Sequence, residues 1–324
     1  MPDTRRVTVQ IVTHNSAPTI DACIASLQAQ TFTDFSTYVW DNASTDDTLP
    51  RVRQHEDVIP LTSADNLGYA AAHNRLLDET NSEYVLTLNP DACLHPEFLS
   101  AMVAALDAEP RAGSAAGCLL RVDQLGDRAL VIDSAGVTMS RTRRQQLLGD
   151  GQPIDRFSHP LPYPFGVDGA AAFYRRAMLE DIRIMGEVFD EDFYMHKEDI
   201  DVCWRAQLRG WSCVYVPSAQ ADHIRSFRPG QQQRERVAAH IRFLAARNRY
   251  LLMLKNEIGA HFVRDLPAIL IYDLALLAYF LLRERSSLGI YRSLWKLRGR
   301  MLAKRKLIQT GRRVSWREIV RWFA

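Results

Sequence analysis

Residues 7–108 alternate between short apolar runs and segments in which apolar residues recur at helical spacing. We expect strands at 7–12, 36–41, 57–62 and 84–89, and helices at 18–30, 68–80 and 96–108. Strands that alternate with helices indicate an α/β fold built on an open, mostly parallel sheet. Such sheets bind ligands beyond the carboxyl ends of their strands, so functional side chains are expected just after each strand.

Short polar residues do follow each predicted strand, namely Thr13 and Asn15, Asp41 and Asn42, Asn66 and Gly68, and Asn89 and Asp91. Turn formation alone explains any one of these loops. Four such edges in one half of the chain favour a shared binding crevice. No Gly-x-Gly-x-x-Gly follows the first strand, so the usual dinucleotide fingerprint is missing. A nucleotide can still bind, with Asp41 on a ribose or base and backbone amides near Asn66 and Gly68 on phosphate.

The stretch HKEDIDVCWRAQLRGW, residues 196–211, places His196, Glu198, Asp199 and Asp201 at the start of a predicted helix. Carboxylates at a helix start are explained by capping and by the helix dipole. Asp201 and Arg205, four residues apart, are likewise explained as a surface ion pair. The stretch alone does not decide between capping and catalysis.

Taken in order, six segments carry a resemblance to a known family: VTVQIVTHNS, WDNASTDDT, DNLGYAAAHN, LTLNPDACLHPEFL, DGAAAFYRRAML and FDEDFYMHKEDIDVCWRAQLRGW. Over residues 5–255 the chain resembles family 2 glycosyltransferases of the GT-A fold, and among them bacterial rhamnosyltransferase-like enzymes. The resemblance implies a Rossmann-like mixed sheet with a C-terminal helical extension. It also implies inverting transfer of a sugar, with rhamnose suggested, from a dTDP- or UDP-sugar to a glycan or lipid-linked glycan in bacterial surface polysaccharide synthesis.

The resemblance further implies roles for individual residues. The sequence NPD stands where the family has a D-x-D-type motif, so Asp91 is expected to bind a divalent cation, Mg²⁺ or Mn²⁺. Asn89 replaces the first carboxylate, which should weaken the cation site. His223, just after a strand predicted at 212–217, is the second metal ligand that the resemblance implies, although a lone His after a strand is usually a satisfied or exposed side chain. The donor-binding residues implied are Thr13, Asn15, Asp41, Asn42, Asn66, Gly68, Asn89 and Asp91.

On the acceptor side, the resemblance makes Asp199 the general base and Glu198 the residue that orients it. It places Asp168, Gly169 and Arg205 against the acceptor. Residues 123–173, rich in Gly, Pro and charge, are expected to form loops around the acceptor pocket. Within them, Arg141, Arg143 and Arg144 could contact a phosphate-bearing acceptor, but the preferred interpretation is that they lie in a solvated loop.

After about residue 232 the pattern is helical only. We therefore divide the chain into a catalytic domain, 1–232, with a nucleotide-sugar half at about 1–120 and an acceptor half at about 121–232, and a helical region, 233–324. Within the latter, 234–256 is amphipathic, and 266–282 is apolar except for Asp273. The apolar stretch is shorter than the ~20 residues that a spanning helix needs. It suits a core helix packed on the sheet or an interfacial helix.

Charge favours the interfacial interpretation. From Arg283 onward the chain has thirteen Lys or Arg residues and only two acidic ones, Glu284 and Glu318, so this segment has a net charge of +11. Because the whole chain carries +2, the remaining residues carry −9. Such a segment can attach to an anionic membrane surface. Binding of nucleic acid is the weaker interpretation, since no nucleic-acid-binding fold accompanies the basic residues.

Composition and cysteine usage set the compartment that we expect. With 47% hydrophobic and 24% charged residues, the chain is globular rather than disordered. Its five cysteines lack any CxxC pair, and MPDTRRVTVQIVTHN has no apolar leader. Both favour the cytoplasm, with peripheral attachment to the inner face of the cell membrane.

Two rival functions stay open on sequence grounds. A sugar nucleotidyltransferase would need a Gly-rich basic loop after the first strand, where this chain has THNSAPT. A non-catalytic nucleotide-sugar-binding scaffold at the membrane is compatible with the missing first Asp of the metal motif. The sequence leaves the sugar, the acceptor, the linkage and any homo-oligomer undetermined.

Overall fold

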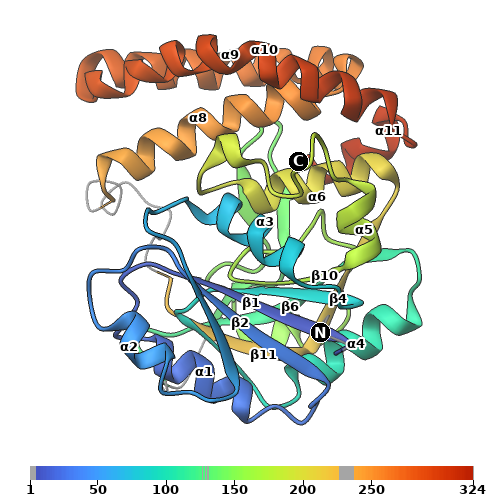
Figure 1. Ribbon diagram of the computed structural model, residues 1–324. Helices are drawn as coiled ribbons and strands as arrows, with labels where there is room; N and C mark the ends of the chain where they lie inside the picture. Colours follow the sequence, from blue (N-terminus) through green and yellow to red (C-terminus); the bar gives the residue numbers. More distant parts are fainter. Residues whose placement is uncertain (1–4, 126, 128, 130, 226–236, 324) are drawn as a thin grey trace.

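A nine-stranded mixed sheet forms the centre of the molecule in this computed structural model, which describes residues 5–125, 127, 129, 131–225 and 237–323 (Figure 1). The strands run in the order β3-β2-β1-β4-β10-β6-β11-β5, and β7 pairs with β6 at the side. Their bounds are β1 Val7–Thr13, β2 Phe35–Asp41, β3 Val58–Thr62, β4 Tyr84–Leu88, β5 Ala92–Leu94, β6 Ala112–Arg121, β7 Val131–Ser134, β10 Ala171–Arg175 and β11 Ser212–His223. A separate hairpin pairs β8, Val137–Met139, with β9, Gln145–Leu147.

The first four strands of the sheet order are parallel, which brings their carboxyl ends to one edge. β1 pairs with β2 in a register that ends with Thr13 opposite Asp41, and β2 continues in parallel to β3. β4 lies on the other side of β1, also parallel. Beyond β4 the sheet is mixed, because β10 runs antiparallel to both β4 and β6.

Helices cover both faces of the sheet, and each face has its own hydrophobic core (Figure 1). On one face pack α1, Ile20–Gln28, and α4, Phe98–Ala108, with the short α2, Thr48–Val52, at the side. On the other pack α3, Tyr69–Glu79, α5, Arg176–Asp181, and α6, Glu198–Arg209. Burial on both faces explains why β4, YVLTL, reads as a nearly continuous apolar run.

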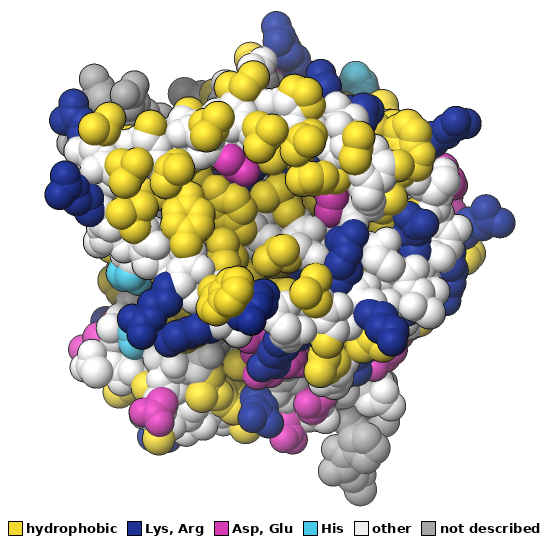
Figure 2. Space-filling view, turned by 90° about the horizontal axis from the view of Figure 1, so that it is seen from above, with side chains coloured by type: hydrophobic (Ala, Val, Ile, Leu, Met, Phe, Trp, Pro, Cys, Tyr) yellow, Lys and Arg dark blue, Asp and Glu magenta, His cyan; other side chains and the backbone are white. Residues whose placement is uncertain are grey.

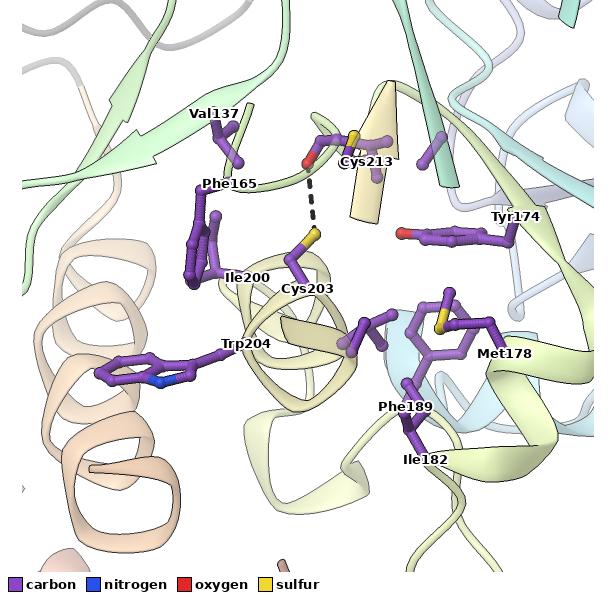
Figure 3. Packing of buried hydrophobic residues seen from close by; sticks show 14 of the residues in the cluster. Val137, Phe165, Tyr174, Met178, Ile182, Phe189, Ile200, Cys203, Trp204 and Cys213 are labelled. Atoms are coloured by element: carbon purple, nitrogen blue, oxygen red, sulfur yellow. Dashed lines mark hydrogen bonds between the residues drawn. The ribbon is translucent and has the colours of Figure 1, made fainter. Parts of the chain in front are cut away.

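The second core centres on α6 (Figure 3). Ile200, Cys203 and Trp204 point from this helix into the core, where Trp204 lies edge-on to Phe165 at a ring-centroid distance of 6.2 Å. The Cys203 thiol donates to the Val167 carbonyl at 3.9 Å. This packing fixes the helix whose first turn carries the Glu198-Asp199 pair.

Three long helices form layers beyond α6: α8, Ala239–Asn256, α9, Gly259–Arg283, and α10, Gly289–Thr310 (Figure 1). Leu251 and Leu252 of α8 and Met301 of α10 belong to the same hydrophobic core as α6. α9 lies in the outermost layer with most of its apolar length exposed, so it is not a core helix packed on the sheet. The predicted domain boundary at 232/233 lies outside the described residues. Near the C-terminus, α11, Trp316–Ile319, packs beside α9 and is followed by a 3-10 helix, Val320–Trp322.

The predicted α/β class is confirmed, and each predicted strand and helix of residues 7–108 is present with ends within two residues of those predicted. The strand predicted at 212–217 is wrong in length, because β11 continues to His223. An irregularity between Val216 and Gln220 lets it resume pairing with β6. Residues 123–173, expected as loops, also contain β7, β8, β9 and the start of β10.

Candidate active site

The residues predicted to hold a nucleotide meet at the carboxyl ends of β1 and β2. The Asp41 carboxylate, 3% exposed, accepts from the Thr13 hydroxyl at 3.2 Å and from the Ser44 backbone N–H at 3.1 Å. Asn15, at φ 55°, accepts the Thr45 N–H at 2.8 Å through its side-chain oxygen. These bonds tie the two loops together and hold Asp41 at the edge of the sheet.

A second set of bonds joins this edge to the loop before α3. The Asn42 side chain donates to the Gly68 carbonyl at 3.2 Å and accepts from the Leu67 N–H at 2.8 Å. Asn66 accepts the Gly68 N–H at 2.9 Å. Gly68 has φ +83°, and a Cβ there would lie 2.5 Å from the Tyr194 ring. Both the backbone conformation and the lack of space therefore require glycine at this position.

Asp91 and His223 approach each other, although 132 positions separate them in the sequence. His223 Nε2 lies 3.5 Å from Asp91 Oδ1, and its Nδ1 is 2.8 Å from Asp133 Oδ2. Burial lowers the pKa of His223, but the hydrogen bond to Asp133 and the nearby negative charge of Asp91 outweigh burial and raise it to about 9. Asp133 thereby orients the imidazole ring, as carboxylates behind metal-binding histidines do.

Asp91 and His223 fit a divalent cation whose coordination shell is completed by ligands from outside the protein. Asp91 Oδ1 is buried and accepts no hydrogen bond from the described residues. A hard carboxylate oxygen with an imidazole nitrogen is a donor set that Mn²⁺ accepts. Within the described part of the chain no group of three or more His, Cys, Asp or Glu side chains is arranged to hold a metal. Further ligands would have to come from the substrate diphosphate and water.

Asp199 sits in the first turn of α6 with its carboxylate turned toward the sheet. It is 8% exposed, and Oδ2 accepts the Gly169 N–H at 3.1 Å while Oδ1 accepts the Ile200 N–H at 2.8 Å. Burial, and next the charge of Asp168, raise its pKa to about 6. The pKa of Glu198 is raised to about 8, by burial and next by the charge of Asp199. A buried carboxylate with a pKa near neutrality is suited to general-base work.

Residues 168–170 join Asp199, the predicted base, to the edge of the sheet that carries the predicted donor residues. The Asn89 backbone N–H donates to the Ala170 carbonyl at 2.8 Å. Gly169, the residue before Ala170, donates its N–H to Asp199. Asp168 forms an ion pair with Arg225 at 2.5 Å, and Arg225 also binds Asp133 at 2.7 Å. The predicted acceptor residues Asp168 and Gly169 therefore lie between the base and the predicted metal ligands.

Arg205 does not join this site, which corrects the prediction that it contacts the acceptor. Its guanidinium is 2% exposed, pairs with Asp201 at 2.8 Å and donates to the carbonyls of Ile182 and Val188. Asp201 itself binds Lys255 at 2.8 Å. The pair is therefore a buried structural one, neither a surface pair nor an acceptor contact.

The sequence interpretation missed the residues that support the site. Asp133 stands behind His223, and Arg225 bridges Asp133 and Asp168. Asn248 of α8 donates to the carbonyls of Phe193, Met195 and His196 at 2.7–3.0 Å. The only signals were an Asp within the apolar run VIDS, an Arg two residues after His223, and an Asn on the inner face of an amphipathic helix.

Asn248 holds a segment whose backbone is strained. Tyr194, His196 and Lys197 all have φ between 65° and 72°, a region that costs non-glycine residues about 1–3 kcal/mol each. The segment leads directly into Glu198 and Asp199, and the Tyr194 carbonyl accepts the Ala70 N–H at 3.2 Å. α8 thus helps to fix both the predicted base and the loop before α3.

Comparisons with known proteins identify the family of the chain. The family model for glycosyl transferase family 2 matches residues 8–183. N-acetylglucosaminyl-diphospho-decaprenol L-rhamnosyltransferase of Mycobacterium tuberculosis is 31% identical over 257 residues, which cover 72% of this chain and 80% of that protein.

Solved structures share the fold at lower identity. S. aureus TarS 1-349 in complex with UDP has a TM-score of 0.56 at 18% identity, with 94% of this chain and 90% of that chain covered. The mannosyltransferase PcManGT from Pyrobaculum calidifontis, in complex with GDP-Man and Mn²⁺, has a TM-score of 0.54 at 19% identity, with 96% and 89% covered.

These findings confirm the predicted fold and enzyme class. The mixed sheet with its antiparallel strand β10, covered by helices, is that of the GT-A fold, and the solved structures share it. Because the family model covers more than half of the chain, and the mycobacterial relative aligns with 72% of it at 31% identity, the chain belongs to glycosyltransferase family 2.

Proposed function

We propose that this chain is an inverting glycosyltransferase that moves rhamnose from a nucleoside-diphosphate donor to a lipid-linked glycan in bacterial surface polysaccharide synthesis. The observation that carries the proposal is the position of Asp199. Its buried carboxylate is one hydrogen bond from Gly169, and Ala170 is hydrogen-bonded to the donor edge at Asn89. The mycobacterial relative is named for transfer of L-rhamnose to a lipid-linked sugar, which supports this choice of donor sugar and acceptor.

In the proposed reaction the chain's side chains hold the donor and receive a proton. Asp41, Asn42 and the Asn66–Gly68 loop would bind the nucleotide, and Asp91 with His223 would hold a divalent cation. When bound, such a cation supplies positive charge beside the leaving diphosphate. The acceptor hydroxyl attacks the anomeric carbon as the bond to the diphosphate breaks, and its proton passes to Asp199. Attack opposite the leaving group inverts the configuration.

The metal role of Asp91 can be tested by nucleotide binding alone. We expect one of UDP, dTDP and GDP to bind more tightly with Mn²⁺ than without it. The Mn²⁺ enhancement should fall at least about tenfold in Asp91→Asn, since that change removes a charged ligand. Isothermal titration calorimetry with and without Mn²⁺ measures both. Binding that ignores Mn²⁺ would remove Asp91 and His223 from the metal site, and no binding of any of the three nucleotides would refute the donor site.

Product analysis separates the two rival functions. Release of pyrophosphate from a nucleoside triphosphate and a sugar phosphate would indicate a sugar nucleotidyltransferase. Donor binding without transfer to any acceptor would indicate the scaffold.

The outer face of α9 and α10 supports attachment to a membrane. Figure 2 shows this face from above, with a broad hydrophobic area and Lys and Arg around it. α9 is long and apolar enough to cross a membrane, and 22% of its apolar window is buried. The exposed large hydrophobic side chains are Val263, Leu270, Ile271, Leu274, Leu281 and Leu282 of α9 and Tyr291, Trp295, Leu302 and Leu307 of α10.

We expect the chain to sediment with vesicles that contain phosphatidylglycerol and to bind pure phosphatidylcholine vesicles weakly. Ile271 is 71% and Leu282 80% exposed, so Ile271→Glu with Leu282→Glu should release the protein without unfolding it. Ile59→Glu, at a 43% exposed position of β3, is the matched control. Vesicle binding unchanged by the double substitution would contradict attachment through this face. A dimer that the same substitution dissociates would show that the face joins two copies of the chain.

A further inference from the structure

Three positively charged side chains converge beside the catalytic helix, outside the residues used above. Lys197 directly precedes Glu198, and the carbonyl of the preceding His196 accepts the Asn248 amide of α8 at 2.7 Å. The charges of Arg249, the next residue on α8, and of Arg144 act on the Lys197 amino group. Arg249 and Arg144 both lie over the Tyr272 ring of α9, with guanidinium carbons 4.7 and 5.5 Å from its centre. The Tyr272 ring thus holds the two guanidinium groups together, within electrostatic range of the Lys197 amino group.

These cations have binding capacity that the described residues leave unused. Arg249 is 3% exposed, pairs with Asp273 at 2.7 Å and donates to the Thr142 carbonyl, yet its buried Nη2 has no partner within the described part of the chain. Across residues 5–225 and 237–323, as far as they are described, no carboxylate pairs with Arg144 or Lys197. By contrast Arg143, next to Arg144, is neutralised by Glu257 and Asp265 at 2.6 Å each.

The electrostatics favour an anion at this place. Burial is the main reason that the pKa of Lys197 falls to about 8, and the charges of Arg249 and Arg144 lower it further against the opposing effect of Asp199. A doubly charged ligand between these side chains would relieve their mutual repulsion. Arg groups bind phosphate oxygens through short, charge-assisted and often bidentate hydrogen bonds.

We propose that Lys197, Arg144 and Arg249 form the binding site for the diphosphate of a polyprenyl-diphosphate-linked acceptor. The proposal rests on the proposed function and names the acceptor class of the same site. Lys197 is two residues from Asp199, so an acceptor sugar placed at the base would direct its anomeric diphosphate toward these cations. Its lipid would then run over Leu270, Ile271 and Leu274, which are 50–71% exposed on α9, the helix that carries Tyr272.

The direct test measures binding of farnesyl diphosphate by calorimetry in EDTA, which keeps the cation-dependent donor site from binding the probe. We expect Arg144→Gln and Lys197→Gln each to weaken binding about tenfold and farnesol binding to stay unchanged. Lys296→Gln, at an exposed position of α10, is the control. Equal affinities in all four proteins would overturn the site. Equal loss of binding to phosphatidylglycerol vesicles would also overturn it, because the cations would then recognise bilayer charge.

Transfer assays separate this proposal from the proposed function. With one acceptor sugar carried either on farnesyl diphosphate or on a simple alkyl chain, the two substitutions should raise KM about tenfold for the diphosphate acceptor only. If diphosphate binding depends on Lys197 and Arg144 but the protein transfers no sugar, the proposed site stands and the proposed function is overturned. Transfer to both acceptors, unaffected by the substitutions, would overturn the site and leave the function.

Discussion

Asp199→Asn is expected to keep donor binding and to lose about 10²- to 10⁴-fold in the rate of sugar transfer. The amide is nearly the same size as the carboxylate and can still accept the Gly169 N–H, which is 3.1 Å from Oδ2 in the native protein. It cannot take a proton from the acceptor hydroxyl. The measurement is steady-state transfer, with calorimetric nucleotide binding as the check on folding.

The same assignment sets a pH dependence. Because burial and the charge of Asp168 raise the pKa of Asp199 to about 6, kcat/KM should fall as pH drops below about 6 and the base becomes protonated. The residual activity of Asp199→Asn should lack this acidic limb. Asp155→Asn, at an exposed position, should match the native protein. Native turnover in Asp199→Asn, or an acidic limb that persists in it, would contradict the base assignment.

The donor edge could be predicted from sequence because two local patterns determine it. Period and run length locate the parallel strands, and parallel strands place their carboxyl ends together. Thr13 and Asp41 therefore had to meet once β1 and β2 were recognised, and the structure pairs them in register. No knowledge of packing was needed.

The supporting residues could not be predicted in this way. Asp133 and His223 lie 90 residues apart and meet only because β7 and β11 both pair with β6. The prediction for Arg205 was wrong for a related reason. The spacing of four residues indicates that Arg205 pairs with Asp201, but it does not indicate which side of the helix is buried. Local pattern specifies elements, whereas the environment of a charged side chain depends on what packs over it.

The basic C-terminal segment shows the same limit and leads to the largest expected effect on stability. Lys304 of α10 was counted with the membrane-facing charges, yet it is 1% exposed. Its amino group lies 2.6 Å from Asp190 and 2.9 Å from both Glu187 and Asp192. The pKa of Asp190 is lowered, because Lys255 and Lys304 together outweigh the opposing effect of burial.

Lys304→Met should reduce the free energy of unfolding by about 3 kcal/mol, because it removes a buried positive charge from Asp190, Glu187 and Asp192 and leaves only Lys255 and Arg300 to neutralise them. Urea unfolding measures this, with Lys306→Met, exposed on the same helix, as the matched control. Asp190, with its lowered folded-state pKa, contributes its full stability above its unfolded pKa of ~3.9 and loses it as pH falls further. The deficit of Lys304→Met should therefore shrink below about pH 4.

Unfolding equal to that of Lys306→Met, with weaker binding to phosphatidylglycerol vesicles, would instead place Lys304 among the lipid-facing charges. The expected result assigns α10 two separate functions. Its inner face neutralises the acidic residues just before the Glu198-Asp199 pair, and only its outer basic residues remain for the membrane. Because the inner contacts hold the segment that leads into the base, loss of α10 should abolish transfer even to acceptors that carry no lipid.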